Sequence, residues 1–122
     1  MVETQDYGTR ALYAVESPEN WFEDFGTGQL TNGQAVITIE PIFAQTVNLT
    51  NDYHVFLTPL GDCALYVKEK SSTSFSVRAM GGQTCSIAFD YRIVAKRLGY
   101  EDVRLAEVDP PPTVEPPGKG AP

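Results

Sequence analysis

The clearest structural signal in the sequence is the run Thr84-Cys85-Ser86-Ile87-Ala88-Phe89-Asp90-Tyr91-Arg92-Ile93-Val94-Ala95-Lys96. Apolar residues occupy every second position from Cys85 to Ala95, and polar residues fill most of the positions between them. Successive side chains of a strand point to opposite faces, so the run predicts a strand with one apolar and one mainly polar face. At about 3.3 Å per residue it would span roughly 40 Å, which is long for a strand. We therefore expect it to bend, or to be the central strand against which shorter strands pair.

Shorter strand-like segments precede this run, with turn signals between them. The Asn32-Gly33 pair favours a type I′ turn, which is the strongest short-range hairpin signal. The apolar face of 85–95 is expected to be buried against Ala35, Ile37, Ile39 and the strand over 53–57. The expected strands are residues 10–15, 29–31, 34–40, 53–58, 63–69 and 74–79, with a last short strand within 100–108.

Two proline signals favour short helices rather than further strands. Ser17-Pro18 fits the start of a single helical turn over 21–25, and Pro41 fits the start of another over 41–47. Short strands in series, without alternating long helices, are typical of antiparallel sheets and not of βαβ units. The sequence therefore predicts an all-β fold, an antiparallel β-sandwich or barrel-like domain with one or two single-turn helices.

The chain has 122 residues, which suits one domain. We expect a polar lead-in over residues 1–9, a β-domain over 10–108 and a proline-rich tail over 109–122. Prolines favour an extended polyproline II conformation, and the tail has too little apolar bulk to fold on itself. We predict that the tail runs across a neighbouring subunit or an adjoining fibre, with Val114 as its anchor.

The composition argues against several classes of function. The net charge is −7, and a nucleic-acid partner would require a basic surface that the sequence lacks. No apolar run approaches the roughly 20 residues of a membrane span. The first residues are polar and acidic and do not resemble a signal peptide. We therefore expect no nucleic-acid partner and no membrane span.

The chain has two cysteines, Cys63 and Cys85, too few for a disulfide framework or a cysteine-only zinc site. They could form a disulfide if the strands that contain them are neighbours. We expect two small buried thiols in preference to that pairing.

Aromatic residues surrounded by acids form the first candidate site. Trp21 and Phe22 lie among Glu16, Glu19, Glu23 and Asp24. Carboxylates beside an aromatic platform could serve glycoside chemistry or sugar stacking. A hydrophobic plug with solvated acids around it is the interpretation that we favour, and Trp21 and Phe22 remain candidates for a ligand or subunit contact.

The remaining candidates lie on strands and in turns. Asp90 and Arg92 share the polar face of the long strand and could contact another strand, another subunit or a ligand. His54 is the sole histidine, and we interpret it as structural because no nucleophile-elbow spacing accompanies it. The acidic turns lack the spacing of a calcium loop. No catalytic residue, metal site or cofactor is predicted.

Several stretches together resemble a C-terminal module found behind repetitive or glycine-rich segments of tail-fibre-like and surface proteins of bacteria and phages. The resemblance covers roughly residues 10–108, and this chain begins just before the module and carries the proline-rich extension after it. The stretches are VESPENWFEDFG (15–26), YHVFLTP (53–59), GDC (61–63) with LYV (65–67), and FDYRIVAKR (89–97).

The resemblance implies a non-enzymatic, all-β terminal module that caps or trimerises a fibre and contacts a receptor. It implies a homotrimer or larger assembly, located on a virion or at the cell surface. A stand-alone structural subunit of a virion or extracellular filament, with no ligand, is one alternative, and a glycan-binding module is another. An enzyme is a distant third class, since one His and two Cys do not provide a nucleophile–base pair or a metal cluster.

Overall fold

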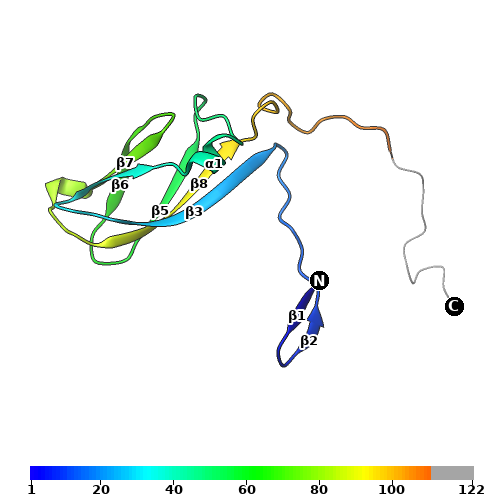
Figure 1. Ribbon diagram of the computed structural model, residues 1–122, viewed down its shortest axis with the longest axis horizontal. Helices are drawn as coiled ribbons and strands as arrows, with labels where there is room; N and C mark the ends of the chain where they lie inside the picture. The colour runs from blue at the N-terminus through cyan, green and yellow to red at the C-terminus, as the bar shows by residue number, and fades with distance from the viewer. Residues whose placement is uncertain (111–122) are drawn as a thin grey trace.

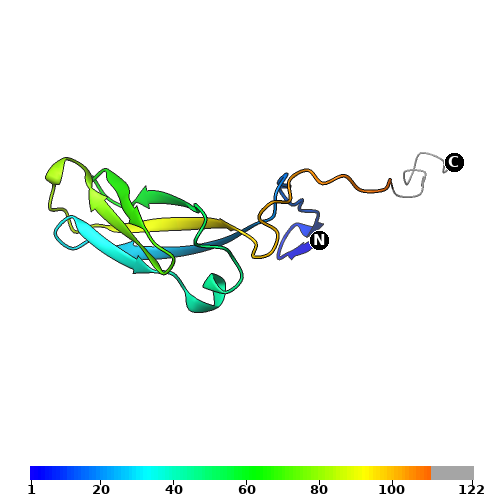
Figure 2. The same ribbon diagram turned by 90° about the horizontal axis from the view of Figure 1, so that it is seen from above.

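A computed structural model describes residues 1–110 of the chain as a β-sandwich preceded by a small hairpin (Figures 1 and 2). One antiparallel sheet has the strand order β3-β8-β5 and the other has the order β4-β7-β6. The all-β, antiparallel fold class predicted from the sequence is confirmed. The strands are β1 (Val2–Thr4), β2 (Gly8–Arg10), β3 (Trp21–Gln29), β4 (Gln34–Thr38), β5 (His54–Pro59), β6 (Leu65–Lys70), β7 (Ser74–Ala79) and β8 (Ala88–Lys96).

The long alternating run is the centre of its sheet, although its strand is shorter than predicted. β8 pairs with β3 over nine positions, from Trp21 opposite Lys96 to Gln29 opposite Ala88, and with β5 on its other side. The strand begins at Ala88 rather than at residue 84, because the residues before it are engaged elsewhere. The carbonyl of Cys85 accepts a hydrogen bond of 2.9 Å from the N–H of Gly33, in the turn that leads into β4.

The core lies between the two sheets and contains the predicted apolar face of β8. Phe89, Ile93 and Ala95 are buried together with Ile39 and Tyr53, and Ala35, Ile37, Val55 and Leu57 pack against them. Two glycines of β3 make room for the large residues of β8. A Cβ on Gly26 would lie 2.2 Å from the hydroxyl oxygen of Tyr91, and one on Gly28 would lie 2.4 Å from the ring of Phe89.

Residues 21–25 form the first half of β3, so the helical turn predicted there is wrong. The oxygen of Ser17 accepts only the N–H of Glu19, at 3.2 Å, and no helix follows this local turn. Uninterrupted pairing with β8 gives these residues a complete ladder of backbone bonds on one side, which a single helical turn would not provide. The second predicted helix is present as α1, Pro41–Ala44, where the Glu40 carboxylate accepts the N–H of Phe43 at 2.6 Å.

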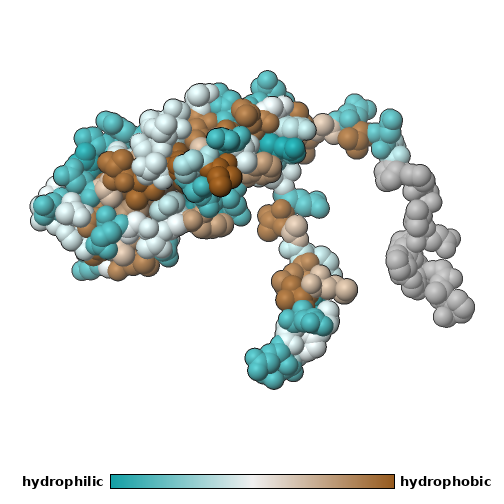
Figure 3. Space-filling view, in the orientation of Figure 1, coloured by the Kyte–Doolittle hydropathy of each residue, from teal (hydrophilic) through white to brown (hydrophobic). Residues whose placement is uncertain are grey.

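The ends of the described chain add one hairpin and lack two predicted strands. The polar lead-in contains the hairpin of β1 and β2, and residues 11–17 lie outside any strand, so the strand predicted over 10–15 is wrong. Figure 3 shows hydrophobic side chains along this connecting segment, where Leu12 and Val15 are exposed. The segment over 100–108 contains turns and a single bridge between Arg104 and Glu19, and not the predicted strand.

The Asn32-Gly33 turn is present, but it joins two sheets instead of two paired strands. Both residues have positive φ, 51° and 77°, as a type I′ turn requires. Thr31 and Gln34 form one bridge across the turn. Beyond that bridge, β3 continues in one sheet and β4 in the other, so the predicted hairpin is limited to the turn itself.

Candidate functional site

The candidate site of this chain is the solvent-facing side of the β3-β8-β5 sheet, which we call the outer face. Residues directly opposite each other in an antiparallel pair project from the same face. The register therefore puts three side chains in each row across the sheet, such as Phe25, Arg92 and Phe56 in one row and Glu23, Val94 and His54 in the next. The outer face consists of Trp21, Glu23, Phe25, Thr27, His54, Phe56, Thr58, Asp90, Arg92, Val94 and Lys96.

Aromatic rings dominate one end of the outer face. The ring centroid of His54 lies 5.4 Å from that of Trp21 and 6.5 Å from that of Phe56. Phe25 is 64% exposed and Phe56 is 53% exposed, although both are large apolar side chains. Exposed aromatic rings on a sheet are a feature of surfaces that bind a partner, because monomeric proteins rarely gather apolar groups in water without use.

Charged groups link these rings into one surface. The Nε of Arg92 donates to the Glu23 carboxylate at 2.7 Å, and its guanidinium lies 5.3 Å from the ring centroid of Phe56. Further along the strand, Asp90 accepts a hydrogen bond of 2.8 Å from the hydroxyl of Thr27. Arg92, Glu23 and Asp90 therefore each have a polar partner within the outer face. Charges that are already paired suit a contact surface better than a reactive centre.

The carboxylate of Glu19 lies where the chain enters and leaves the sandwich. It accepts the indole N–H of Trp21 at 3.1 Å and forms ion pairs with Lys96 at 3.4 Å and Arg104 at 3.2 Å. Partial desolvation of this carboxyl raises its pKa. The hydrogen bond from Trp21 and the charges of Lys96 and Arg104 act in the opposite direction and hold the pKa of Glu19 below its ordinary value. We call this end of the sandwich the junction end.

Glu101 is the second acid of the junction end. Its Oε1 accepts the N–H of Gly99 at 2.9 Å and the amide of Asn48 at 3.2 Å. The hydrogen bond from the backbone of Gly99 is the main reason that the pKa of Glu101 lies below its ordinary value. Lys96 donates to the backbone carbonyl of Glu101 at 3.0 Å and so connects the two acids.

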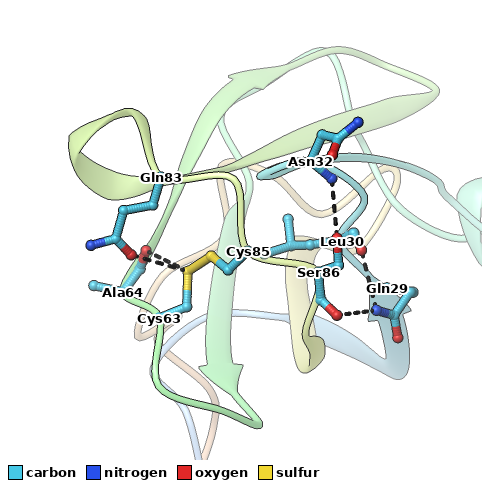
Figure 4. The surroundings of a disulfide bond; sticks show 8 residues. All are labelled: Gln29, Leu30, Asn32, Cys63, Ala64, Gln83, Cys85 and Ser86. Carbon is cyan, nitrogen blue, oxygen red and sulfur yellow. Dashed lines mark hydrogen bonds between the residues drawn. A yellow bond between two sulfur atoms is a disulfide. The ribbon is translucent and has the colours of Figure 1, made fainter.

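Cys63 and Cys85 form a disulfide across a sequence separation of 22 residues (Figure 4). The expectation of two buried thiols is therefore wrong, and the alternative pairing is present. The bond does not join neighbouring strands. It ties the connection before β6 to the connection before β8, at the end of the sandwich that holds the Asn32-Gly33 turn. We call this the distal end.

The structure brings together three of the predicted contact residues. Trp21, Asp90 and Arg92 all project from the outer face. Phe22 belongs to the opposite side of β3, where the guanidinium of Arg97 lies 5.6 Å from its ring centroid. Val114, and with it the predicted path of the tail, lies outside the described residues.

Sequence reasoning did not name Phe25 or Phe56 as contact residues, and it assigned His54 a structural role. It placed Lys96 on the polar face of the long strand, as a solvated charge. The alternating pattern of residues 53–58 could have identified two of these residues. His54 and Phe56 occupy the alternate positions of that strand, whose side chains point outward. Phe25 was interpreted as part of a hydrophobic plug with Trp21 and Phe22, and the register with β8 is what places it on the outer face beside Trp21.

Within residues 1–110, no group of three or more His, Cys, Asp and Glu side chains is placed to hold a metal ion. None of the helical segments in that same range has the length and apolar character needed to cross a membrane. A shallow groove of about 300 Å³ lies between β5 and β6, and its wall includes the outer-face residues His54 and Phe56.

No protein-family model and no curated protein matches this sequence.

Proposed function

We propose that the chain is a non-enzymatic structural module of a tail-fibre-like or other extracellular assembly, attached at its junction end and presenting its distal end outward. The observation that carries the proposal is the position of the two chain connections. β3 begins opposite the end of β8, with Trp21 paired to Lys96. The backbone before β3 also bonds to the segment after β8, because the N–H of Leu105 donates to the carbonyl of Pro18 at 2.8 Å. Figure 1 shows both connections leaving the sandwich at this end.

The disulfide supports an extracellular or virion location. Such bonds persist in oxidising surroundings and are rare in reducing cytosol. The Cys63–Cys85 bond lies at the distal end, where it braces the part of the domain that the proposal presents to the exterior. Its contribution to stability would be lost in a reducing compartment.

Immunogold electron microscopy with an antibody raised against the purified chain tests this proposal. We expect gold particles on filaments, on released particles or on the surface of the source cells. An antibody against the Asn32-Gly33 turn should label intact assemblies, whereas one against the junction segment 97–105 should label them only after dissociation. Labelling confined to the cell interior would overturn the proposed location, and equal labelling by the two antibodies would overturn the proposed attachment.

Glycan binding on the outer face is the second candidate function, and the aromatic cluster favours it. Trp21, His54 and Phe56 offer ring faces, and Arg92 and Glu23 next to them offer polar partners on a shallow surface. Sugars bind to such combinations through ring stacking and hydrogen bonds. This arrangement contains no enclosed pocket and would suit an extended saccharide.

A glycan array separates the two candidates. If the outer face binds glycans, the wild-type chain should give saturable signals that Phe56→Ser lowers by at least tenfold. The matched control is Val36→Ser, because Val36 is 70% exposed on the other sheet. Signals that are lost equally in both variants, or no signal from the wild-type chain, would exclude the outer face as a glycan site.

A further inference from the structure

β3 is the longest edge strand of the sandwich and the one with the fewest features that discourage pairing. A free strand edge is a template for another strand, and proteins usually protect it with proline, lysine, a bulge or short length. Among the described strands, β4 has five residues, β5 ends at Pro59, and β6 has a bulge between Val67 and Glu69 and carries Lys68 and Lys70. β3 has nine residues, no proline, no lysine and no register shift.

Two hydrogen bonds show which backbone groups of β3 face the open side. The carbonyl of Asn20 accepts the N–H of Arg97 at 2.8 Å, and the N–H of Leu30 donates to the carbonyl of Ile87 at 2.9 Å. In an antiparallel ladder, alternate residues direct both backbone groups toward the same neighbour. Even-numbered residues of β3 therefore bond to β8. Odd-numbered residues, from Trp21 to Gln29, direct their N–H and C=O groups away from it.

We propose that β3 pairs with β3 of a second copy of this chain, antiparallel and about a two-fold axis at Phe25. This register puts odd-numbered residues opposite odd-numbered residues, so each outward N–H meets an outward C=O. It also keeps the two outer faces on one side. The two three-stranded sheets become one continuous six-stranded sheet in the order β5-β8-β3-β3-β8-β5, which covers the open β3 edge of both copies.

The side chains of β3 are self-complementary in this register. The first half of the strand is bulky and residues 26–28 of the second half are small, and antiparallel pairing brings the two halves together. Phe22 meets Gly28 of the second copy, and Trp21 meets Gln29. The two acids avoid each other as direct partners, because Glu23 lies opposite Thr27 and Asp24 lies opposite Gly26. Phe25 meets itself, so its exposed ring gains an aromatic partner.

One outward donor already has a partner in the single chain. The N–H of Phe25 donates to its neighbouring Asp24 carboxylate at 2.9 Å. Pairing exchanges this bond for one to the carbonyl of Phe25 in the second copy. The exchange lowers the net gain from the two Phe25 bonds, because each of them replaces an existing bond. The contact is independent of the proposed fibre role, since the purified chain alone can show it.

Sedimentation of the full chain at micromolar concentration tests the pairing. Wild type should show a monomer–dimer equilibrium, and Thr27→Pro should raise the dissociation constant by more than about tenfold. The N–H of Thr27 points to the open edge, so proline there leaves the β8 ladder intact and removes two inter-copy bonds, one on each side of the axis. Thr27→Ala is the control, because it also loses the hydroxyl bond to Asp90 but keeps the N–H. It should associate like wild type.

Cross-linking tests the position of the axis. Cα atoms of a hydrogen-bonded antiparallel pair are about 5.5 Å apart, within disulfide range. Phe25→Cys should therefore give a covalent dimer on mild oxidation, whereas Phe56→Cys, two strands away on the same face, should not. An unchanged far-ultraviolet circular dichroism spectrum confirms that each variant is folded. A monomeric wild type, a trimer that Thr27→Pro leaves intact, or equal cross-linking of the two cysteine variants would each overturn the proposed pairing.

Discussion

The two ends of the sandwich are held by different chemistry. At the distal end, the Cys63–Cys85 disulfide joins two connections covalently, and the N–H of Gly33 binds the carbonyl of Cys85 beside it. At the junction end, ion pairs and hydrogen bonds around Glu19 join the chain segments instead. One end therefore depends on redox conditions, while the other depends on charge.

Because of this difference, the two ends respond to different solution conditions. A disulfide is insensitive to salt and moderate acid, whereas partly exposed ion pairs weaken when salt screens them or when a carboxylate is protonated. In the proposed assembly, the fixed end faces the exterior and the adjustable end faces the attachment. The two ends are separated by the nine paired positions of β3 and β8, and distant sites usually contribute to stability independently. Perturbing each end in turn tests this independence.

Removal of the disulfide should have the largest effect. The double variant, in which alanine replaces both Cys63 and Cys85, is expected to lose about 3 kcal/mol of unfolding free energy. The reason is that the bond closes a loop of 22 residues in the unfolded chain. Urea denaturation measures the change. Reduced wild type is the control, since it loses the bond and keeps both side chains. A loss below about 1 kcal/mol would mean that packing alone holds the distal end.

Packing at the distal half of β3 can be tested separately through Gly28. An added Cβ would lie 2.4 Å from Cζ of Phe89, whose side chain is completely buried and has little room to move. We expect Gly28→Ala to lower the unfolding free energy by about 2 kcal/mol through overpacking. Thr27→Ala, one position away on the exposed face, should change it by less than about 0.5 kcal/mol. Equal effects would contradict the assignment of Gly28 to the core side.

The strand that was predicted best is the one whose own sequence alternates. From Phe89 to Ala95 the apolar positions follow a period of two, and this period alone assigns them to the core. β3 lacks that signal, because Gly26 and Gly28 take the positions where apolar side chains would mark the inner face. Its strand conformation comes from pairing with β8, and a single sequence does not show which segments pair.

The same limit explains the partial success with the site. Trp21 and Arg92 were predicted as separate candidates, and they share a surface only because the register between β3 and β8 aligns residues about 70 positions apart. Phe56 was missed because its exposure depends on the sheet in which β5 lies. The disulfide was ranked second because Cys63 and Cys85 meet through connections and not through paired strands.

The smallest expected effect concerns the charges at the junction end. The pKa values of Glu19 and Glu101 are lower in the folded chain than their ordinary values. Lowered carboxyl pKa values stabilise the folded state above the unfolded-state pKa, and the benefit disappears as pH falls through the folded-state pKa. Stability should therefore be constant near neutral pH and decrease as pH falls below the ordinary range of a glutamate carboxyl. The disulfide at the distal end should remain intact throughout.

Trp21 reports on this change, because it is the single tryptophan of the chain and its indole N–H binds Glu19. We expect acid to shift its fluorescence before the domain unfolds, as Glu19 is protonated and releases Lys96 and Arg104. Glu19→Gln keeps an acceptor for the indole but removes the charge, so it should lower the melting temperature less than loss of the disulfide and flatten the fluorescence response. If Glu19→Gln leaves the acid response of Trp21 unchanged, the junction end is held by its backbone bonds and not by charge.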